Sequence, residues 1–80
     1  MKKTQVTSIE QLDKMLEQEQ TDFVIASGIL RSSKHITSDG EKYYVLHLID
    51  DTEEELSAEE LMESNIGAAM RNGNFYCEEY

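Results

Sequence analysis

A run of six polar residues, Asp50-Asp51-Thr52-Glu53-Glu54-Glu55, is the densest group of potential metal ligands in the chain. Carboxylate oxygens are the ligands that Ca²⁺ prefers in proteins. An EF-hand loop, however, alternates its ligands along the chain and carries a central glycine, and this run has neither feature. We therefore predict that the run binds no metal.

Further carboxylates follow this run, so that residues 50–63 hold eight of the seventeen acidic residues of the chain. Such a surface suits a basic protein partner, because opposite charges attract across an interface. An alternative is a polyanion mimic of the phage or mobile-element type, which imitates nucleic acid and inhibits a nucleic-acid-binding protein. A third interpretation is a solvated face that only serves solubility. The acidic candidate protein-interaction residues are Asp50, Asp51, Glu53, Glu54, Glu55, Glu59, Glu60 and Glu63.

Two histidines, His35 and His47, are the other residues that suit metal binding. Both fall in predicted strands, whose pairing brings them near each other but not directly opposite. A zinc site would need a third ligand, and no cysteine or carboxylate lies at a diagnostic spacing from them. We interpret His47, between Leu46 and Leu48, as a half-buried strand residue and His35, beside Lys34, as an exposed one.

The nucleophiles of the chain lack the surroundings that catalysis needs. Ser27, Ser32 and Ser33 lie near a histidine by strand pairing, but no Gly-x-Ser-x-Gly elbow surrounds them. The only thiol, Cys77, is followed by two glutamates, whose charge raises its pKa and lowers its reactivity. Gly28 is isolated, so there is no glycine-rich loop to hold a phosphate. We therefore predict a protein that is not an enzyme and uses no metal and no cofactor.

The net charge of −10 is carried almost entirely by the last part of the chain. Residues 1–49 hold six Lys/Arg and seven Asp/Glu, whereas residues 50–80 hold one basic residue and ten acidic ones. Nucleic acids and anionic membranes attract basic surfaces, so we expect direct binding to neither. A single cysteine suits a reducing compartment, and no apolar run approaches the roughly 20 residues that span a bilayer. The expected location is the cytoplasm.

Two capping boxes indicate where helices begin. Ser8-Ile9-Glu10-Gln11 places a hydroxyl at the N-cap and an amide three residues later, and the apolar residues that follow are spaced for one helical face. This pattern predicts a helix over 9–19, preceded by a flexible N-terminus over 1–7. Ser57-Ala58-Glu59-Glu60 is the second box. With a stop at Asn72-Gly73, it predicts a helix over 58–71.

Between these helices, β-branched and aromatic residues predict two strands, at 23–37 and 42–50. The Asp39-Gly40 pair between them is a strong hairpin signal, so the strands should pair antiparallel. A glycine and two serines inside the first strand favour a bulge or a bend there. The remaining residues, 74–80, can form a short third strand.

The register of this hairpin depends on the length of its loop. A two-residue loop centred on Asp39-Gly40 sets Leu30 opposite Ile49. A three-residue loop with a bulge at the glycine sets Leu30 opposite Leu48. The sequence leaves both registers open.

These elements define a single α+β domain over residues 1–80, in which the helices pack on one face of the sheet. In the second predicted strand, Tyr43 and Val45 share one face and Tyr44 and Leu46 share the other. A strand that is apolar on both sides is usually buried on both sides. We therefore predict that another molecule covers the second face, and Tyr43 and Tyr44 are further candidate interaction residues.

The most economical functional hypothesis is a small acidic cytoplasmic module that binds or regulates another protein. The partner is expected to be a protein, with a basic surface as one option, and the apolar hairpin predicts that the chain can also form a homodimer or a higher homo-oligomer. The polyanion mimic is the alternative from a different class.

Overall fold

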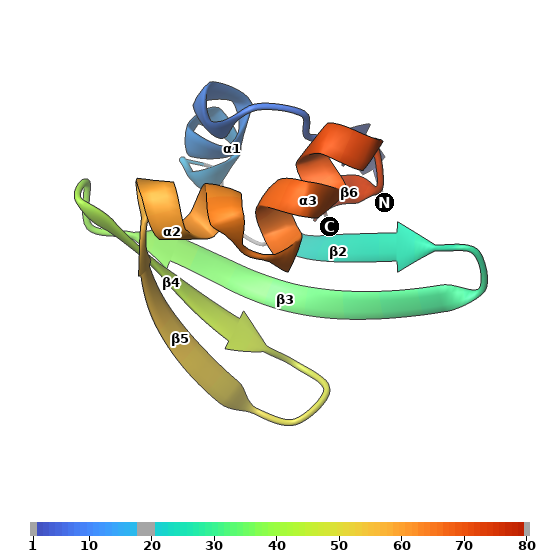
Figure 1. The fold of residues 1–80 in the computed structure, drawn as a ribbon. Coiled ribbons are helices and arrows are strands. Elements are labelled where there is room, and N and C mark those ends of the chain that lie inside the picture. The colour runs from blue at the N-terminus through green and yellow to red at the C-terminus, as the bar shows by residue number, and fades with distance from the viewer. Residues whose placement is uncertain (1, 18–20, 80) are drawn as a thin grey trace.

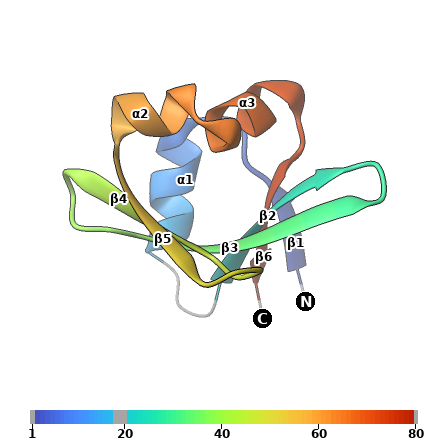
Figure 2. The same cartoon turned by 60° about the horizontal axis from the view of Figure 1, so that its bottom comes forward.

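The computed structural model describes residues 2–17 and 21–79, which form a six-stranded antiparallel sheet and three helices (Figure 1). The strand order across the sheet is β1-β6-β2-β3-β4-β5. The α+β class and the helices on one face are therefore as predicted (Figure 2). The elements are β1 (Lys2–Gln5), α1 (Ile9–Leu16), β2 (Thr21–Ser27), β3 (Leu30–Ser38), β4 (Lys42–His47), β5 (Thr52–Ser57), α2 (Ala58–Glu63), α3 (Asn65–Asn72) and β6 (Phe75–Glu79).

Both predicted helix starts are confirmed by their capping hydrogen bonds. The Ser8 hydroxyl accepts from the Gln11 backbone N–H and caps α1. At α2, Ser57 and Glu60 exchange the two reciprocal hydrogen bonds of a capping box. Helix α1 ends at Leu16, before the predicted end at residue 19, which lies outside the described residues.

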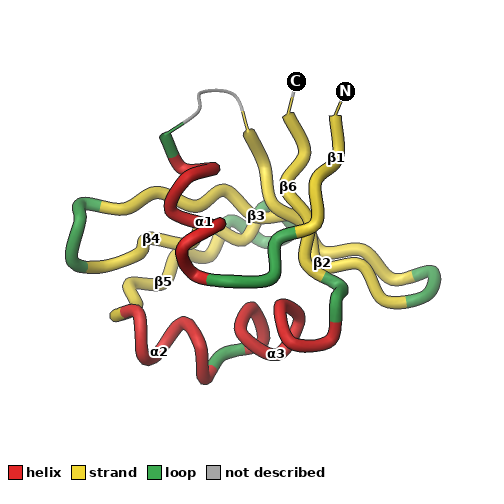
Figure 3. Tube along the Cα trace, turned by 90° about the horizontal axis from the view of Figure 1, so that it is seen from above, coloured by secondary structure: helices red, strands yellow, loops and turns green. Residues whose placement is uncertain are grey.

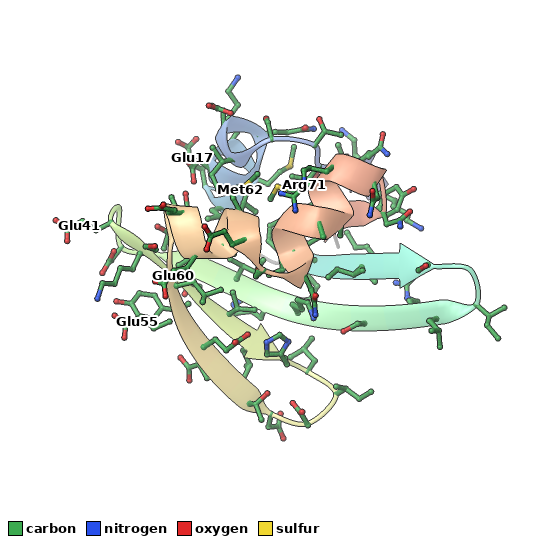
Figure 4. All side chains as sticks on the ribbon, in the orientation of Figure 1. Glu17, Glu41, Glu55, Glu60, Met62 and Arg71 are labelled. Carbon is green, nitrogen blue, oxygen red and sulfur yellow. The ribbon has the colours of Figure 1, made fainter. Side chains whose placement is uncertain are left out.

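The prediction of one continuous helix over 58–71 is wrong, because the chain forms two helices, α2 and α3, that are separated at Ser64. This residue is extended (ψ 179°) and ends α2 while it caps α3. Its hydroxyl donates to the Leu61 carbonyl and accepts from the Ile66 N–H, so both helix ends are satisfied by one side chain. Arg71 donates from α3 to the Met62 carbonyl at 2.8 Å, across the corner between the two helices (Figure 4).

The predicted strand over 23–37 is in fact two strands, β2 and β3, that pair with each other. The chain reverses at Gly28-Ile29, because Ser27 pairs with Leu30. Gly28 has a φ of 63° and Ile29 has a negative φ, which is the pattern of a type II′ turn with glycine at its first central position. The predicted bend is thus a complete hairpin turn.

The hairpin at Asp39-Gly40 is confirmed, but both predicted registers are wrong. Ser38 pairs with Tyr43, so four residues separate the paired positions. Asp39 Oδ1 accepts from the backbone N–H groups of Glu41 and Lys42 and holds this longer turn together.

Strand β4 ends at His47, earlier than the predicted residue 50, and the acidic run beyond it contains a further strand, β5. Strand β5 pairs with β4 at the edge of the sheet. Charged residues have low strand propensity but are common on edge strands, where they hinder pairing with other chains. A Lys42–Glu55 ion pair across the two strands supports the pairing.

Residues 2–5, expected to belong to a flexible N-terminus, form the opposite edge strand, β1. Strand β1 pairs with β6, the C-terminal strand that was predicted and that lies between β1 and β2. The two ends of the chain therefore run side by side (Figure 3). Lys3 also lies 4.4 Å from the centre of the Tyr76 ring and helps to fix β1.

The core lies between the helices and the sheet. Phe23 of β2 and Phe75 of β6 are fully buried and stack with their ring centroids 5.6 Å apart. Leu12 of α1, Leu61 of α2 and Met70 of α3 close over them from the helical layer. Each helix thus contributes apolar residues to the same core.

The Asp39 turn predicts a pH effect. Hydrogen bonds from the backbone of Lys42 and Glu41 and from the Tyr44 hydroxyl lower the pKa of Asp39 from 3.8 to about 2. Because the folded-state pKa is depressed, this stabilisation is present above pH 3.8 and is lost as the pH falls through about 2. Asp39→Asn keeps an acceptor oxygen but does not titrate. As the pH falls from 3.8 to about 2, the free energy of unfolding should decrease less for this variant than for the wild type, as measured by urea unfolding at each pH. An unchanged slope would contradict the prediction.

Candidate functional site

The eight acidic residues between 50 and 63 gather along one edge of the molecule. They occupy the β4–β5 turn, the edge strand β5 and helix α2, and all eight are exposed. Glu55 near the end of β5 and Glu60 near the start of α2 lie on the same side of the domain (Figure 4). We call this surface the acidic edge; its members are Asp50, Asp51, Glu53, Glu54, Glu55, Glu59, Glu60 and Glu63.

Half of the acidic edge is engaged within the chain. Glu54 binds His47, Glu55 pairs with Lys42, Glu60 completes the α2 capping box, and Asp50 accepts from Thr52. The other four carboxylates make no ion pair or hydrogen bond with the described residues, and their charges are open to solvent. They are Asp51, Glu53, Glu59 and Glu63.

Exposed aliphatic side chains adjoin the acidic edge. Leu48 and Ile49, which the sequence placed in a strand, lie in the β4–β5 turn beside Asp50, and Ile49 is 81% exposed. The β2–β3 turn carries another exposed pair, Ile29 and Leu30. Both turns lie at the same end of the antiparallel sheet, because β2 and β4 run in the same direction.

The two tyrosines predicted as interaction residues lie in different environments. Tyr43 is buried, and its hydroxyl donates to Asp13 on α1 at 2.6 Å, so it belongs to the core and not to an exposed interface. Burial, the hydrogen bond to Asp13 and the nearby charges of Asp13 and Glu10 together raise the pKa of Tyr43 to about 12, with burial as the largest cause. Tyr44 is half-buried on the face away from the helices and donates to Asp39.

The sheet face away from the helices is partly covered by the chain itself. Val24 is fully buried on this face, although all three described helices lie on the other side of the sheet (Figure 2). Arg31 forms an ion pair with Glu78, and His35 Nδ1 lies 3.5 Å from Asp22 Oδ1. Charged side chains therefore lie among the apolar residues of this face.

A polar network on the helix-facing side was not predicted. Lys34 lies directly opposite His47, and only 5% of its surface is exposed. Its Nζ is 3.0 Å from Ser32 Oγ and 3.1 Å from His47 Nδ1, while His47 Nε2 is 2.6 Å from Glu54. The ammonium can only donate, so Nδ1 accepts and the Nε2–H donates to Glu54. One sequence signal for the position of Lys34 was available: it is two residues from Ile36, so the two side chains lie on the same face of the strand.

This network lines a groove of about 620 Å³ between the sheet and the α2–α3 corner. Burial lowers the pKa of Lys34 from 10.5, and the charges of Glu54 and Asp50 oppose that shift. His35, on the other face, does not reach the groove, so the two histidines are separated by the sheet. The groove is lined by Ile25, Ser32, Lys34, His47, Glu54, Glu63, Ser64, Asn65, Ile66, Ala68, Ala69, Asn72 and Asn74.

The thiol of Cys77 is buried in the core on β6. Burial is the largest cause that raises its pKa to about 11, and Glu79, Asp22 and Glu78 add to the effect. The predicted direction of this shift is confirmed, with burial as the main reason. A thiol with this pKa is almost entirely protonated at neutral pH and reacts slowly.

Comparisons of the chain with protein-family models, with curated proteins and with solved structures gave no match. Among the helices that the structure describes, none has both the length and the apolar character to cross a bilayer.

Proposed function

We propose that this protein is a non-enzymatic binding module that presents its acidic edge to a protein partner with a basic surface. The observation that carries the proposal is an acidic edge in which four carboxylates have no partner within the described residues and which ends, at the β4–β5 turn, in an 81% exposed aliphatic side chain, Ile49. Interfaces combine a few apolar anchors with a surrounding polar rim. Complementary charge then steers the partner and sets its orientation.

The edge strand offers a second means of contact. Strand β5 is paired on one side only, by β4, so alternate backbone N–H and C=O groups face outward. A basic extended segment of the partner can add to this edge as a further strand, with its side chains near the glutamates of β5. We further propose the cytoplasm as the location, since Cys77 is a free and buried thiol.

The polyanion mimic remains the alternative, and it shares the acidic edge with the leading proposal. A mimic of the phosphate backbone works through charge alone, whereas Leu48 and Ile49 place apolar surface next to that charge. This difference favours a protein-type interface with an apolar anchor. Self-association of the chain also remains a prediction, which sedimentation at several concentrations tests.

Charge substitutions at matched positions test the proposal. The partner is captured from a lysate of the native host, purified, and titrated against each variant. Glu53→Gln with Glu59→Gln removes two carboxylates that have no partner within the described residues. As a control, Glu10→Gln with Glu17→Gln removes one carboxylate in the first turn of α1 and one at its C-cap. Each pair includes one glutamate from the first turn of a helix.

The acidic-edge pair should weaken partner binding by about tenfold, because each exposed ion pair contributes up to about 1 kcal/mol. It should also flatten the dependence of affinity on salt, while the α1 pair changes neither. Equal losses from both pairs would indicate non-specific attraction to the net charge and would contradict the proposal.

The contribution of the apolar anchor, Ile49, is tested with Ile29 as the matched control. Ile49→Ser should weaken partner binding by roughly ten- to a hundredfold, since a buried isoleucine contributes about 1.5–3 kcal/mol. Ile29→Ser changes an isoleucine of the other hairpin turn that is fully exposed, and it should leave the affinity nearly unchanged. If Ile49→Ser has no effect but the charge pair does, the interface is purely electrostatic and the mimic becomes the better account.

A further inference from the structure

The groove beside the α2–α3 corner contains a buried lysine whose ammonium makes no ion pair with the described residues. Lys34 is 5% exposed and lines the groove, and its ammonium contacts two other lining residues, Ser32 and His47. Removing a lysine from water costs free energy, and a methionine at this position would bury the same stem without that cost. A side chain that is unfavourable for folding is often retained because it takes part in binding.

One N–H group of the Lys34 ammonium has no acceptor within the described residues. The ammonium carries three N–H groups, and within the described residues two of them have acceptors, at Ser32 and at His47. The third is available to a group inside the groove. A carboxylate is the strongest acceptor that a ligand can offer there.

The opposite charge is also available in the groove. Glu63, near the end of α2, lines the groove and makes no ion pair or hydrogen bond with the described residues. The other carboxylate of the lining, Glu54, is already engaged by His47. Three side-chain amides add donors and acceptors between charged groups, and they belong to Asn65, Asn72 and Asn74.

We propose that this groove binds a small zwitterion of the α-amino-acid type, with its carboxylate on Lys34 and its ammonium on Glu63. A lining with one available cation and one available carboxylate is complementary to a ligand that carries both charges. A simple anion would be repelled by Glu63, and a simple cation by Lys34. The volume of about 620 Å³ lies within the usual range for small-molecule sites. This proposal shares Glu63 with the acidic edge but does not rest on the protein-binding proposal.

The standard amino acids, each at millimolar concentration, are the probes. Binding is followed by the chemical shifts of the side-chain amides of Asn65, Asn72 and Asn74 and quantified by calorimetry. For the amino acid that binds best, the N-acetyl derivative removes the ammonium and the primary amide removes the carboxylate. Both derivatives should bind at least about tenfold more weakly, because each leaves a charged group in the groove without its partner.

Variants of the chain test the same assignment. Lys34→Met and Glu63→Gln should each weaken binding by about ten- to a hundredfold. Lys42→Met and Glu59→Gln are the controls, since both change exposed residues outside the groove lining, and they should keep the affinity of the wild type. Lys34→Met should also unfold at the same or a higher urea concentration. If that variant fails to fold, Glu63→Gln at the surface still decides the question.

The proposal is overturned if no amino acid shifts the three amides, or if the two derivatives bind as well as the parent. It is also overturned if Glu63→Gln retains full affinity. Loss of partner binding in the acidic-edge variants would not affect these results, because Glu53 and Glu59 lie outside the groove lining.

Discussion

Gly67→Ala should destabilise the domain by about 3 kcal/mol or more, although alanine is the better helix former by about 1 kcal/mol. Gly67 lies in α3 where this helix crosses the end of α2. A Cβ on this residue would lie 2.0 Å from the carbonyl oxygen of Met62, which is a backbone atom that cannot rotate away. In the variant, α2 and α3 must therefore separate at the corner that hydrogen bonds from the Ser64 hydroxyl and the Arg71 guanidinium hold together.

Urea unfolding of Gly67→Ala beside Ala68→Gly separates packing from helix propensity. Ala68→Gly should lose only about 1 kcal/mol, as expected for a glycine inside a helix. Propensity alone predicts opposite signs for the two substitutions, whereas the close approach of α3 to α2 predicts a loss for both. A Gly67→Ala variant as stable as the wild type would show that the two helices do not meet in this way.

Phe75→Ala should cost about 3–5 kcal/mol, which is most of the stability that a domain of this size has. The ring is fully buried, stacks on Phe23, and lies on β6, an interior strand between β1 and β2. The Phe75 carbonyl also accepts from the Val6 N–H, so β6 joins the N-terminal segment to the core. Loss of this ring leaves a cavity that strands on both sides cannot fill.

The matched control is Tyr44→Ala, at a half-buried tyrosine on the sheet face away from the helices. It should cost much less, because its ring is not enclosed by helices. Calorimetric unfolding of both variants would measure the difference. Similar losses in the free energy of unfolding from the two substitutions would contradict the assignment of the main core to the helix-facing side of the sheet.

The helix starts could be predicted from the sequence because each depends on a local pattern. Ser8 and Ser57 satisfy helix N–H groups within a few residues of themselves, so no distant contact is needed to recognise them. The break at Ser64 also has a local signal, a serine before Asn65. The apolar residues on either side of it, however, continue with helical spacing, and that pattern concealed the break.

The sheet was harder to predict because its pairing is decided by distant residues. Gly28 allows a turn, but only the pairing of β3 with both β2 and β4 makes the reversal necessary. The glutamates of β5 have low strand propensity and form a strand because β4 offers them an open edge. The two-residue spacing from Ile36 puts Lys34 on the helix-facing side of β3, but the groove that encloses Lys34 is lined by residues distant from it in the sequence.

The acidic edge could be found from composition alone, since its residues all fall within one short stretch, residues 50–63. The sequence does not show which of these carboxylates are engaged within the chain, because the partners of Glu54 and Glu55 are His47 and Lys42 on the neighbouring strand. The division into engaged and unengaged carboxylates identifies Glu53 and Glu59 as two of the four positions where a substitution removes charge without breaking a contact among the described residues.

The location of the interface is tested most directly by the backbone amide chemical shifts of the protein during titration with its purified partner. We expect the shifts to concentrate in residues 48–63, in the β4–β5 turn, β5 and α2, and to require roughly ten- to a hundredfold more partner for Ile49→Ser. Shifts centred instead on Tyr44 and the other residues of the uncovered sheet face, with residues 48–63 unchanged, would contradict this expectation and would leave the acidic edge a role in solubility alone.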